Sequence, residues 1–195
     1  MKVLKDAMLS IAGHVENVAN SLSEEEIEVL ISAMQDADKV FIYGAGRSGL
    51  VAKAFTMRLM HLGFNVYVIG EIITPAINND DLLITISGSG ETTSVVAAAE
   101  IAKKAGAKVI LITTYPKSTL GKKADLCVTV KGRTKLKGDK NFLLRQIKGE
   151  HYSLAPLGTL FEVGVLIFLD GLVAELMAKL GKSEDDLRTR HATIE

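Results

Sequence analysis

The sequence predicts an α/β protein, a three-layer sandwich in which a five-stranded parallel sheet is flanked by helices. Two observations predict it. Short, nearly continuous Val/Ile/Leu runs alternate with helical segments along most of the chain, which is typical of parallel strands buried on both faces. Apolar residues make up 48% of the chain but aromatic residues only 5%, so the core should be aliphatic. At 195 residues, the whole chain, 1–195, is expected to form a single domain.

Two helices are expected before the first strand, within residues 3–36. The first, over residues 3–19, carries an apolar stripe at helical spacing. The stripe consists of Leu4, Met8, Ile11, Val15 and Val18. The second helix begins after Ser23, a good N-cap, and Glu26 stands three residues later, as in a capping box.

The remaining elements alternate. The strands are expected at residues 39–44, 65–70, 81–87, 107–114 and 125–130. Helices are expected at residues 46–63 and 91–105, each closed by a glycine, with a short turn or helix at 117–123. A mostly apolar helix over residues 158–180 follows and stops at Gly181, and Ser183 caps the tail. The all-round apolar character of helix 158–180 predicts burial on several sides, partly in a subunit contact.

Composition excludes several classes of partner. Lys+Arg and Asp+Glu both number 23, so no basic field for nucleic acid exists. The single cysteine, Cys127, excludes an internal disulfide framework and is expected to fill the core. No stretch resembles a signal peptide, and no apolar run is long enough to cross a bilayer. We therefore expect a cytoplasmic protein without nucleic-acid or membrane partners.

The stretch "SGSGETTS", Ser87 to Ser94, is the strongest candidate for chemistry. It follows the third strand, and ligands of open parallel sheets collect beyond the carboxyl ends of the strands. Gly88 and Gly90 allow close approach of the backbone, and the next helix directs free N–H groups at the turn. The hydroxyl donors are Ser87, Ser89, Thr92 and Thr93. These features favour a phosphomonoester site over a plain strand-to-helix turn, with Glu91 pointing outward.

The stretch "GAGRSG", residues 44–49, follows the first strand and has two interpretations. Its G-x-G-x-x-G spacing, with Glu71 after the second strand, matches a dinucleotide fingerprint. However, Arg47 and Ser48, beside Gly46, place a cation and a hydroxyl where nucleotide folds keep small residues. Those groups suit a small phosphorylated polyol better.

The segment 131–152 breaks the pattern and is rich in Lys, Arg and Gly. We interpret it as a long loop. It could close over an anionic substrate as a lid or remain a solvated segment. A nucleic-acid role is the least favoured of its interpretations, because aromatic residues that could stack on bases are few.

Four stretches together resemble the sugar isomerase (SIS) domain family and, within it, the 6-phospho-3-hexuloisomerases. They are "GAGRSGLVAKAFTMRLMHLGF", "DLLITISGSGETTSV", "ADLCVTV" and "PLGTLFEVGVLIFLDGLVAELM". The resemblance implies a flavodoxin-like strand order and a homo-oligomer, commonly a tetramer, with active sites near subunit interfaces. It also implies interconversion of D-arabino-hex-3-ulose 6-phosphate, a phosphorylated ketohexose, and fructose 6-phosphate, without cofactor or metal.

Such an isomerisation moves a proton between neighbouring carbons through a cis-enediol, so a positioned base is needed. Glu162 is our first candidate, because it is an acid in the first turn of an otherwise apolar helix. The alternative is an acid that merely complements the helix dipole. His61, at a helix C-terminus, and His191, in the tail, are further catalytic candidates that a subunit boundary could bring in. Arg47 and Ser48 are expected to hold sugar hydroxyls or the enediolate oxygen.

Two other functions stay open at this level. One is an aldose–ketose phosphate isomerase, acting for example on arabinose 5-phosphate, which would predict an additional regulatory module. The other is a non-catalytic sugar-phosphate sensor, which would keep the serine-rich loop but need no base. A sensor would also carry a DNA-binding segment, and the N-terminal helices are too few and too acidic for one.

Overall fold

The computed structural model describes residues 2–132, 155–156, 158–191 and 193. The strands are β1 (Val40–Gly44), β2 (Val66–Val68), β3 (Leu82–Ile86), β4 (Lys108–Thr113) and β5 (Leu126–Thr129). The helices are α1 (Lys2–Ala19), α2 (Glu24–Asp36), α3 (Arg47–Leu62), α4 (Thr93–Lys104), α6 (Thr159–Leu180) and α7 (Glu184–Arg188). All strand pairs are parallel and follow the order β2-β1-β3-β4-β5, which confirms the predicted sheet and its flavodoxin-like order.

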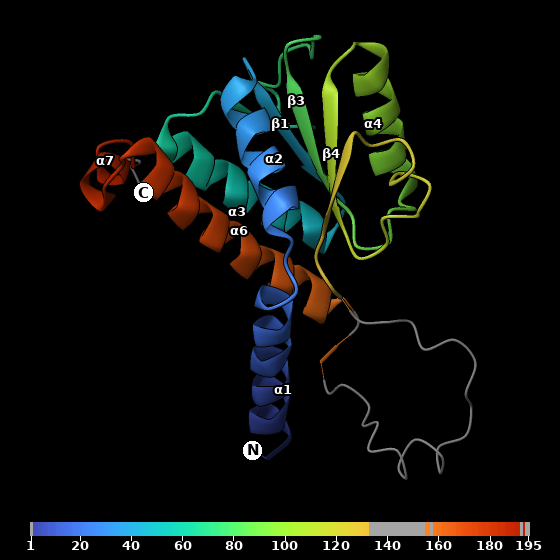
Figure 1. Ribbon diagram of the computed structural model, residues 1–195, viewed down its shortest axis with the longest axis vertical. Helices are drawn as coiled ribbons and strands as arrows, with labels where there is room; N and C mark the ends of the chain where they lie inside the picture. Colours follow the sequence, from blue (N-terminus) through green and yellow to red (C-terminus); the bar gives the residue numbers. More distant parts are fainter. Residues whose placement is uncertain (1, 133–154, 157, 192, 194–195) are drawn as a thin grey trace.

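Alternate residues of each central strand enter two separate cores, as the pleat requires. Val40 and Ile42 of β1 face α2, α3 and α6, whereas Phe41 faces the other layer. That second layer contains α4, whose Val95 and Ala99 are buried against the sheet. Figure 1 shows α4 on one side of the sheet and α2, α3 and α6 on the other, so the sandwich has the three predicted layers.

Helices α3 and α6 pack side by side on the same face of the sheet. Their first turns meet, because Arg47 bonds to Glu162, and Arg58 further along α3 lies 3.9 Å from Asp170 of α6. The two helices therefore run in the same direction. Both helices end at the predicted glycines, Gly63 and Gly181, which adopt the left-handed conformation.

Helix α1 extends away from the rest of the chain (Figure 1). Its C-terminal part packs on α6, but Val18 is the only buried residue that it contributes. Of the predicted stripe, Leu4 and Met8 are 55% and 62% exposed, Ile11 and Val15 are partly buried, and Val18 is buried.

The capping box predicted at Ser23 forms only in part. The Ser23 hydroxyl accepts the Glu26 N–H at 3.3 Å, as expected. The Glu26 carboxylate does not turn back to Ser23 but accepts the Thr129 N–H at 2.8 Å. Thr129 belongs to the edge strand β5, whose outer N–H groups have no neighbouring strand to bond to. The Glu26 carboxylate therefore accepts a backbone hydrogen bond that the sheet itself cannot form. A complete capping box occurs instead at Ser183 and Asp186.

Two predictions lie partly beyond these observations. From residue 133 onward, the basic loop predicted at 131–152 lies outside the described residues, and the single-domain assignment of 1–195 stays a prediction. Among the described helices, none is both long enough and apolar enough to cross a membrane.

A buried ion pair joins the amino ends of β1 and β3. Asp81 is 2% exposed, and its two oxygens each lie 3.0 Å from Lys39 Nζ. Its Oδ2 also accepts the Asn78 N–H at 2.7 Å. Because Lys39 and Asp81 directly precede the paired residues Val40 and Leu82, their bond helps to hold the register of the two strands.

We predict that Asp81→Ala lowers the free energy of unfolding by about 3 kcal/mol, since it leaves a part-buried ammonium without its partner. Urea denaturation of the purified protein measures this. Asp80→Ala is the matched control, because Asp80 is the adjacent acid but is exposed, and its effect should stay below about 0.5 kcal/mol. Equal losses for the two variants would contradict the role of the pair.

Candidate active site

The two loops that the sequence selected lie side by side at the carboxyl edge of the sheet. In the parallel register of β1 and β3, Gly44 pairs with Ile86, so the loops that follow start at the same level. Helix α3 begins after Gly46 and α4 after Thr92, and no described side chain caps either start. By contrast, serine side chains cap α2 and α7. Two helix N-termini with available N–H groups therefore meet at one place, which favours an anion.

The serine-rich loop holds its own shape. Ser87 is only 3% exposed, and its Oγ accepts the Gly90 N–H at 3.1 Å. Gly90 has φ of +63°, and a side chain there would collide with the Ser118 hydroxyl. Ser87 thus braces the loop from inside, and its predicted contact with a ligand stays a prediction. Ser89, Thr92 and Thr93 are the more accessible hydroxyls of the predicted set.

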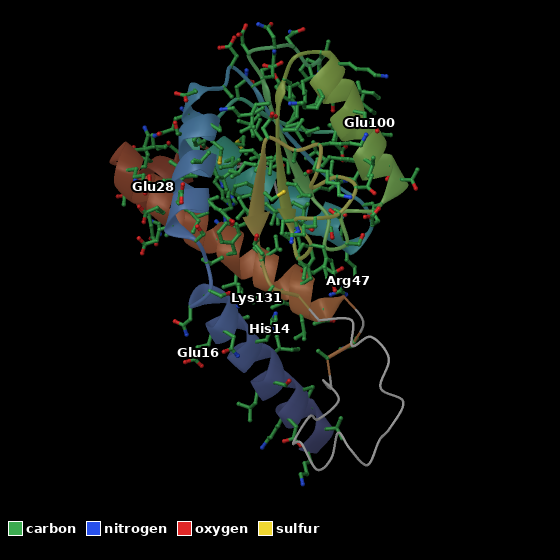
Figure 2. All side chains as sticks on the ribbon, turned by 45° about the vertical axis from the view of Figure 1, so that its right-hand side comes forward. His14, Glu16, Glu28, Arg47, Glu100 and Lys131 are labelled. Carbon is green, nitrogen blue, oxygen red and sulfur yellow. The ribbon has the colours of Figure 1, made fainter. Side chains whose placement is uncertain are left out.

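Gly88 connects the loop to the first turn of α6. A Cβ at Gly88 would lie 2.8 Å from the Phe161 ring, so only glycine allows this contact. The residue after Phe161 is Glu162, so the same turn of α6 carries the candidate base. Arg47 Nε donates to Glu162 Oε2 at 2.7 Å, and their side chains are 60% and 15% exposed. Figure 2 shows Arg47 beside the first turns of α6.

Glu91 points away from the candidate phosphate site, as predicted, and binds the neighbouring loop. Its Oε1 accepts the Thr119 N–H at 2.8 Å. Hydrogen bonds from the Thr119 hydroxyl and then from its backbone N–H hold the pKa of Glu91 below its ordinary value. Backbone bonds from Leu120 to Gly90 and from Thr114 to Gly88 join the same two loops. The Glu91–Thr119 hydrogen bond therefore helps to fix the serine-rich loop.

The loop after β4 is the part of the site that sequence reasoning missed. None of its residues, Thr113 to Ser118 ("TTYPKS"), was predicted to have a role. In the structure, Thr113 Oγ1 donates to Gly88 O at 3.3 Å and accepts the Tyr115 N–H at 3.1 Å. The run of hydroxyl residues after a buried strand was the available signal, because such side chains commonly bond to nearby backbone.

The histidines form a second group, apart from Glu162. His61 is 4% exposed and stacks on His191, with ring centroids 5.0 Å apart. They line an open groove of about 340 Å³ together with Arg58, Asp170 and residues of α7. Because Arg47 and His61 occupy opposite ends of α3, they are about 20 Å apart along the helix. One chain therefore does not bring the three predicted catalytic residues together.

The Arg47–Glu162 site can perform acid–base chemistry on an anionic ligand. A carboxylate that is mostly shielded from water can take up a proton, and the adjacent guanidinium can stabilise negative charge on an oxygen. Glu71, which a dinucleotide site would use, instead pairs with Lys53 at 2.6 Å. Within the described part of the chain, no three His, Cys, Asp or Glu side chains converge as a metal site would require.

Comparison with known proteins places the chain in a family. The SIS domain model matches residues 33–136. A 3-hexulose-6-phosphate isomerase of Bacillus subtilis is 40% identical over 185 residues, which cover 95% of each protein. An uncharacterized protein of Methanothermobacter thermautotrophicus is 47% identical over the whole chain and 98% of its own length. A crystal structure from Methanococcus jannaschii, described as inferring 3-hexulose-6-phosphate isomerase function, superposes with a TM-score of 0.77 at 34% identity, and the match covers both chains completely.

The Glu91–Thr119 hydrogen bond gives a testable prediction. Glu91→Ala should weaken binding of fructose 6-phosphate about three- to tenfold, because the loop loses a hydrogen bond that orders it before binding. Glu91→Gln keeps an acceptor oxygen and should bind within about twofold of the unaltered protein. Isothermal titration calorimetry measures the dissociation constants.

Glu100→Ala is the matched control for Glu91→Ala. Glu100 is likewise a glutamate that bonds to the segment after β4, through Lys123 at 2.8 Å, but it lies away from the serine-rich loop (Figure 2). Its loss should leave the affinity unchanged. An equal weakening by Glu91→Ala and Glu100→Ala would contradict a specific role of Glu91.

Proposed function

The chain belongs to the SIS domain family, and we propose that it is a 6-phospho-3-hexuloisomerase. It would interconvert D-arabino-hex-3-ulose 6-phosphate and fructose 6-phosphate. The observation that carries the proposal is the Arg47–Glu162 pair in the first turns of α3 and α6, where the neighbouring Phe161 ring lies against Gly88 of the serine-rich loop. A pure binding module needs the loop but has no use for a shielded carboxylate beside it. The names of relatives at 34–40% identity support the choice of substrate.

The phosphate of the substrate would lie on the serine-rich loop. The N-termini of α3 and α4 supply N–H groups, and Ser89, Thr92 and Thr93 supply hydroxyl donors. Ser48, in the first turn of α3, is close enough along the chain to add a hydroxyl. With Glu91 turned toward Thr119, its charge does not oppose the phosphate.

Glu162 is the proposed base. Its carboxylate removes the proton from C2 of the 3-ketose, and the C3 carbonyl becomes the oxygen of a cis-enediolate. Glu162 then returns the proton to C3, while the hydroxyl proton on O2 moves to O3 and the C2–O2 bond becomes a carbonyl. No atom is gained or lost. The guanidinium of Arg47 would stabilise the enediolate oxygen, for which its bond to Glu162 already positions it.

We propose that a second copy of the chain brings its His61 and His191 to the Arg47–Glu162 site. Arg47, Leu50, Met57 and His61 lie on one side of α3, since one or more whole helical turns separate them. Leu50 and Met57 are 68% and 45% exposed, so an apolar surface runs between the two polar ends. Antiparallel pairing of this surface with its copy would bring the partner's histidine pair to Arg47 and Glu162. A twofold axis creates two such composite sites.

No observation favours the alternatives over this proposal. An aldose–ketose isomerase would use the same base and loop, so only the substrate separates it. A sensor would bind the sugar phosphate without turnover. Both are outcomes of the assay below.

The test is turnover of 3-hexulose 6-phosphate, generated in situ from formaldehyde and ribulose 5-phosphate, with fructose 6-phosphate formation coupled to a reporter. We expect turnover by the purified protein, and none with arabinose 5-phosphate. Glu162→Gln should lower kcat at least about a hundredfold, because it cannot accept the proton. Circular dichroism verifies that the variant folds.

Each result has a definite meaning. Absence of turnover by folded protein that still binds fructose 6-phosphate would favour the sensor, and turnover only with the pentose phosphate would favour the aldose–ketose isomerase. Near-normal kcat for Glu162→Gln would remove Glu162 as the base and leave His61 or His191.

The composite site predicts complementation between two inactive variants. Glu162→Gln and His61→Asn should each be inactive alone. After mixing and subunit exchange, about a quarter of the wild-type activity should return, because half of the pairs are mixed and each contains one intact site. Mixing Glu162→Gln with Glu162→Ala is the control and should restore nothing. An inactive mixture whose subunits have demonstrably exchanged would contradict the shared site.

A further inference from the structure

Two glycines from neighbouring loops hold the first turn of α6, the turn that carries Glu162. A Cβ at Gly88, after β3, would lie 2.8 Å from the Phe161 ring, and a Cβ at Gly132, after β5, would lie 3.0 Å from Phe161 Cβ. The Phe161 side chain is only 7% exposed, so it fills the space between these loops. The backbone around Phe161 and Glu162 is therefore fixed from two sides.

Gly158, the N-cap of α6, has a different neighbour, the carboxylate of Glu162. The Glu162 N–H donates to Gly158 O at 3.1 Å, so the two residues lie one helical turn apart. Helix side chains point toward the N-terminus of their helix, and the Glu162 side chain accordingly lies back over Gly158. A Cβ at Gly158 would lie 3.0 Å from both Oε1 and Oε2, below the optimal separation of about 3.5 Å for non-bonded atoms. The carboxylate therefore lies where a side chain at residue 158 would crowd it.

The position of the carboxylate decides what its two oxygens can do. Oε2 accepts the Arg47 Nε–H at 2.7 Å. Oε1 has no hydrogen-bond partner among the described residues, so it is available to a proton of the substrate. Proton transfer requires the base within hydrogen-bond distance of the substrate, and small displacements of a reacting group lower the rate.

We propose that Gly158 is a positioning residue for Glu162, and that its missing side chain allows the carboxylate to lie across the start of α6 beside Arg47. The inference rests on the proposed function, in which Glu162 is the base. Gly158→Ala would have two effects, since it strains a backbone with φ of +87° and pushes the carboxylate away from Arg47. Because Phe161 is held between Gly88 and Gly132, the helix cannot shift to make room.

Gly181 separates the two effects, because it lies at the other end of the same helix. It also has a positive φ, +62°, but a Cβ there would meet no atom within 4 Å. Gly181→Ala is therefore strained in the backbone, as Gly158→Ala is, but it displaces no side chain. Both variants should lower the midpoint of urea denaturation to a similar extent.

Kinetics with 3-hexulose 6-phosphate test the positioning role. Gly158→Ala should lower kcat about tenfold and keep KM within about twofold, because the serine-rich loop is unaltered. Gly181→Ala should keep both parameters within about twofold of wild type. In the Glu162→Gln background, Gly158→Ala should lower the residual kcat less than about twofold, since the carboxylate that it displaces is absent. Equal kcat values for the two glycine variants, or a further loss of about tenfold in the Glu162→Gln background, would overturn the proposal.

A second measurement needs no turnover and so separates this proposal from the proposed function. A hydrogen-bonded Arg47 Nε–H exchanges with water more slowly than a free one, and NMR measures the rate, with Arg47→Lys used to assign the signal. Gly158→Ala should speed this exchange at least about fivefold, whereas Gly181→Ala should keep it within about twofold. Absence of turnover by the wild-type protein would contradict the proposed function. Unchanged exchange in Gly158→Ala would contradict the role of Gly158.

Discussion

The parallel pairing of β1 with β3 is the constraint on which the candidate site depends. Because Gly44 lies opposite Ile86, both strands end at one level, and the helices that follow start beside each other. A shift of one residue in this register would turn each strand residue to the opposite face. The Lys39–Asp81 pair holds the far end of the same two strands. The register thus fixes where two sets of free N–H groups meet.

The sequence predicted the strands and the serine-rich loop because these depend on local patterns, whereas the strand order was implied by the family resemblance. Buried strands need continuous apolar residues, and a glycine at a crowded turn is visible in the sequence. Glu162 was selected as an acid within an apolar helix, and its catalytic role stays a prediction. Its partner Arg47 was assigned to the substrate instead, because a contact across 115 residues has no local signal. For the same reason, the Glu26 carboxylate was assigned to its own helix, although it caps β5.

The separation of the histidines from Glu162 has a physical origin. Helices α3 and α6 run in the same direction, so their first turns and their last turns form two distinct clusters. No rearrangement of side chains can join groups at opposite ends of α3. A sequence shows which residue types are available, but it does not show that one chain keeps them apart. Under the proposed function, a second copy of the chain would bring them together.

The proposed pairing through α3 would also cover part of the apolar surface that one chain leaves exposed. The exposed apolar residues include Leu50 and Met57 of α3 and Leu4 and Met8 of α1, so they lie on two different helices. Pairing of α3 with its copy about one twofold axis would cover Leu50 and Met57. The proposed α3 pair would therefore account for Leu50 and Met57 but not for the exposed residues of α1.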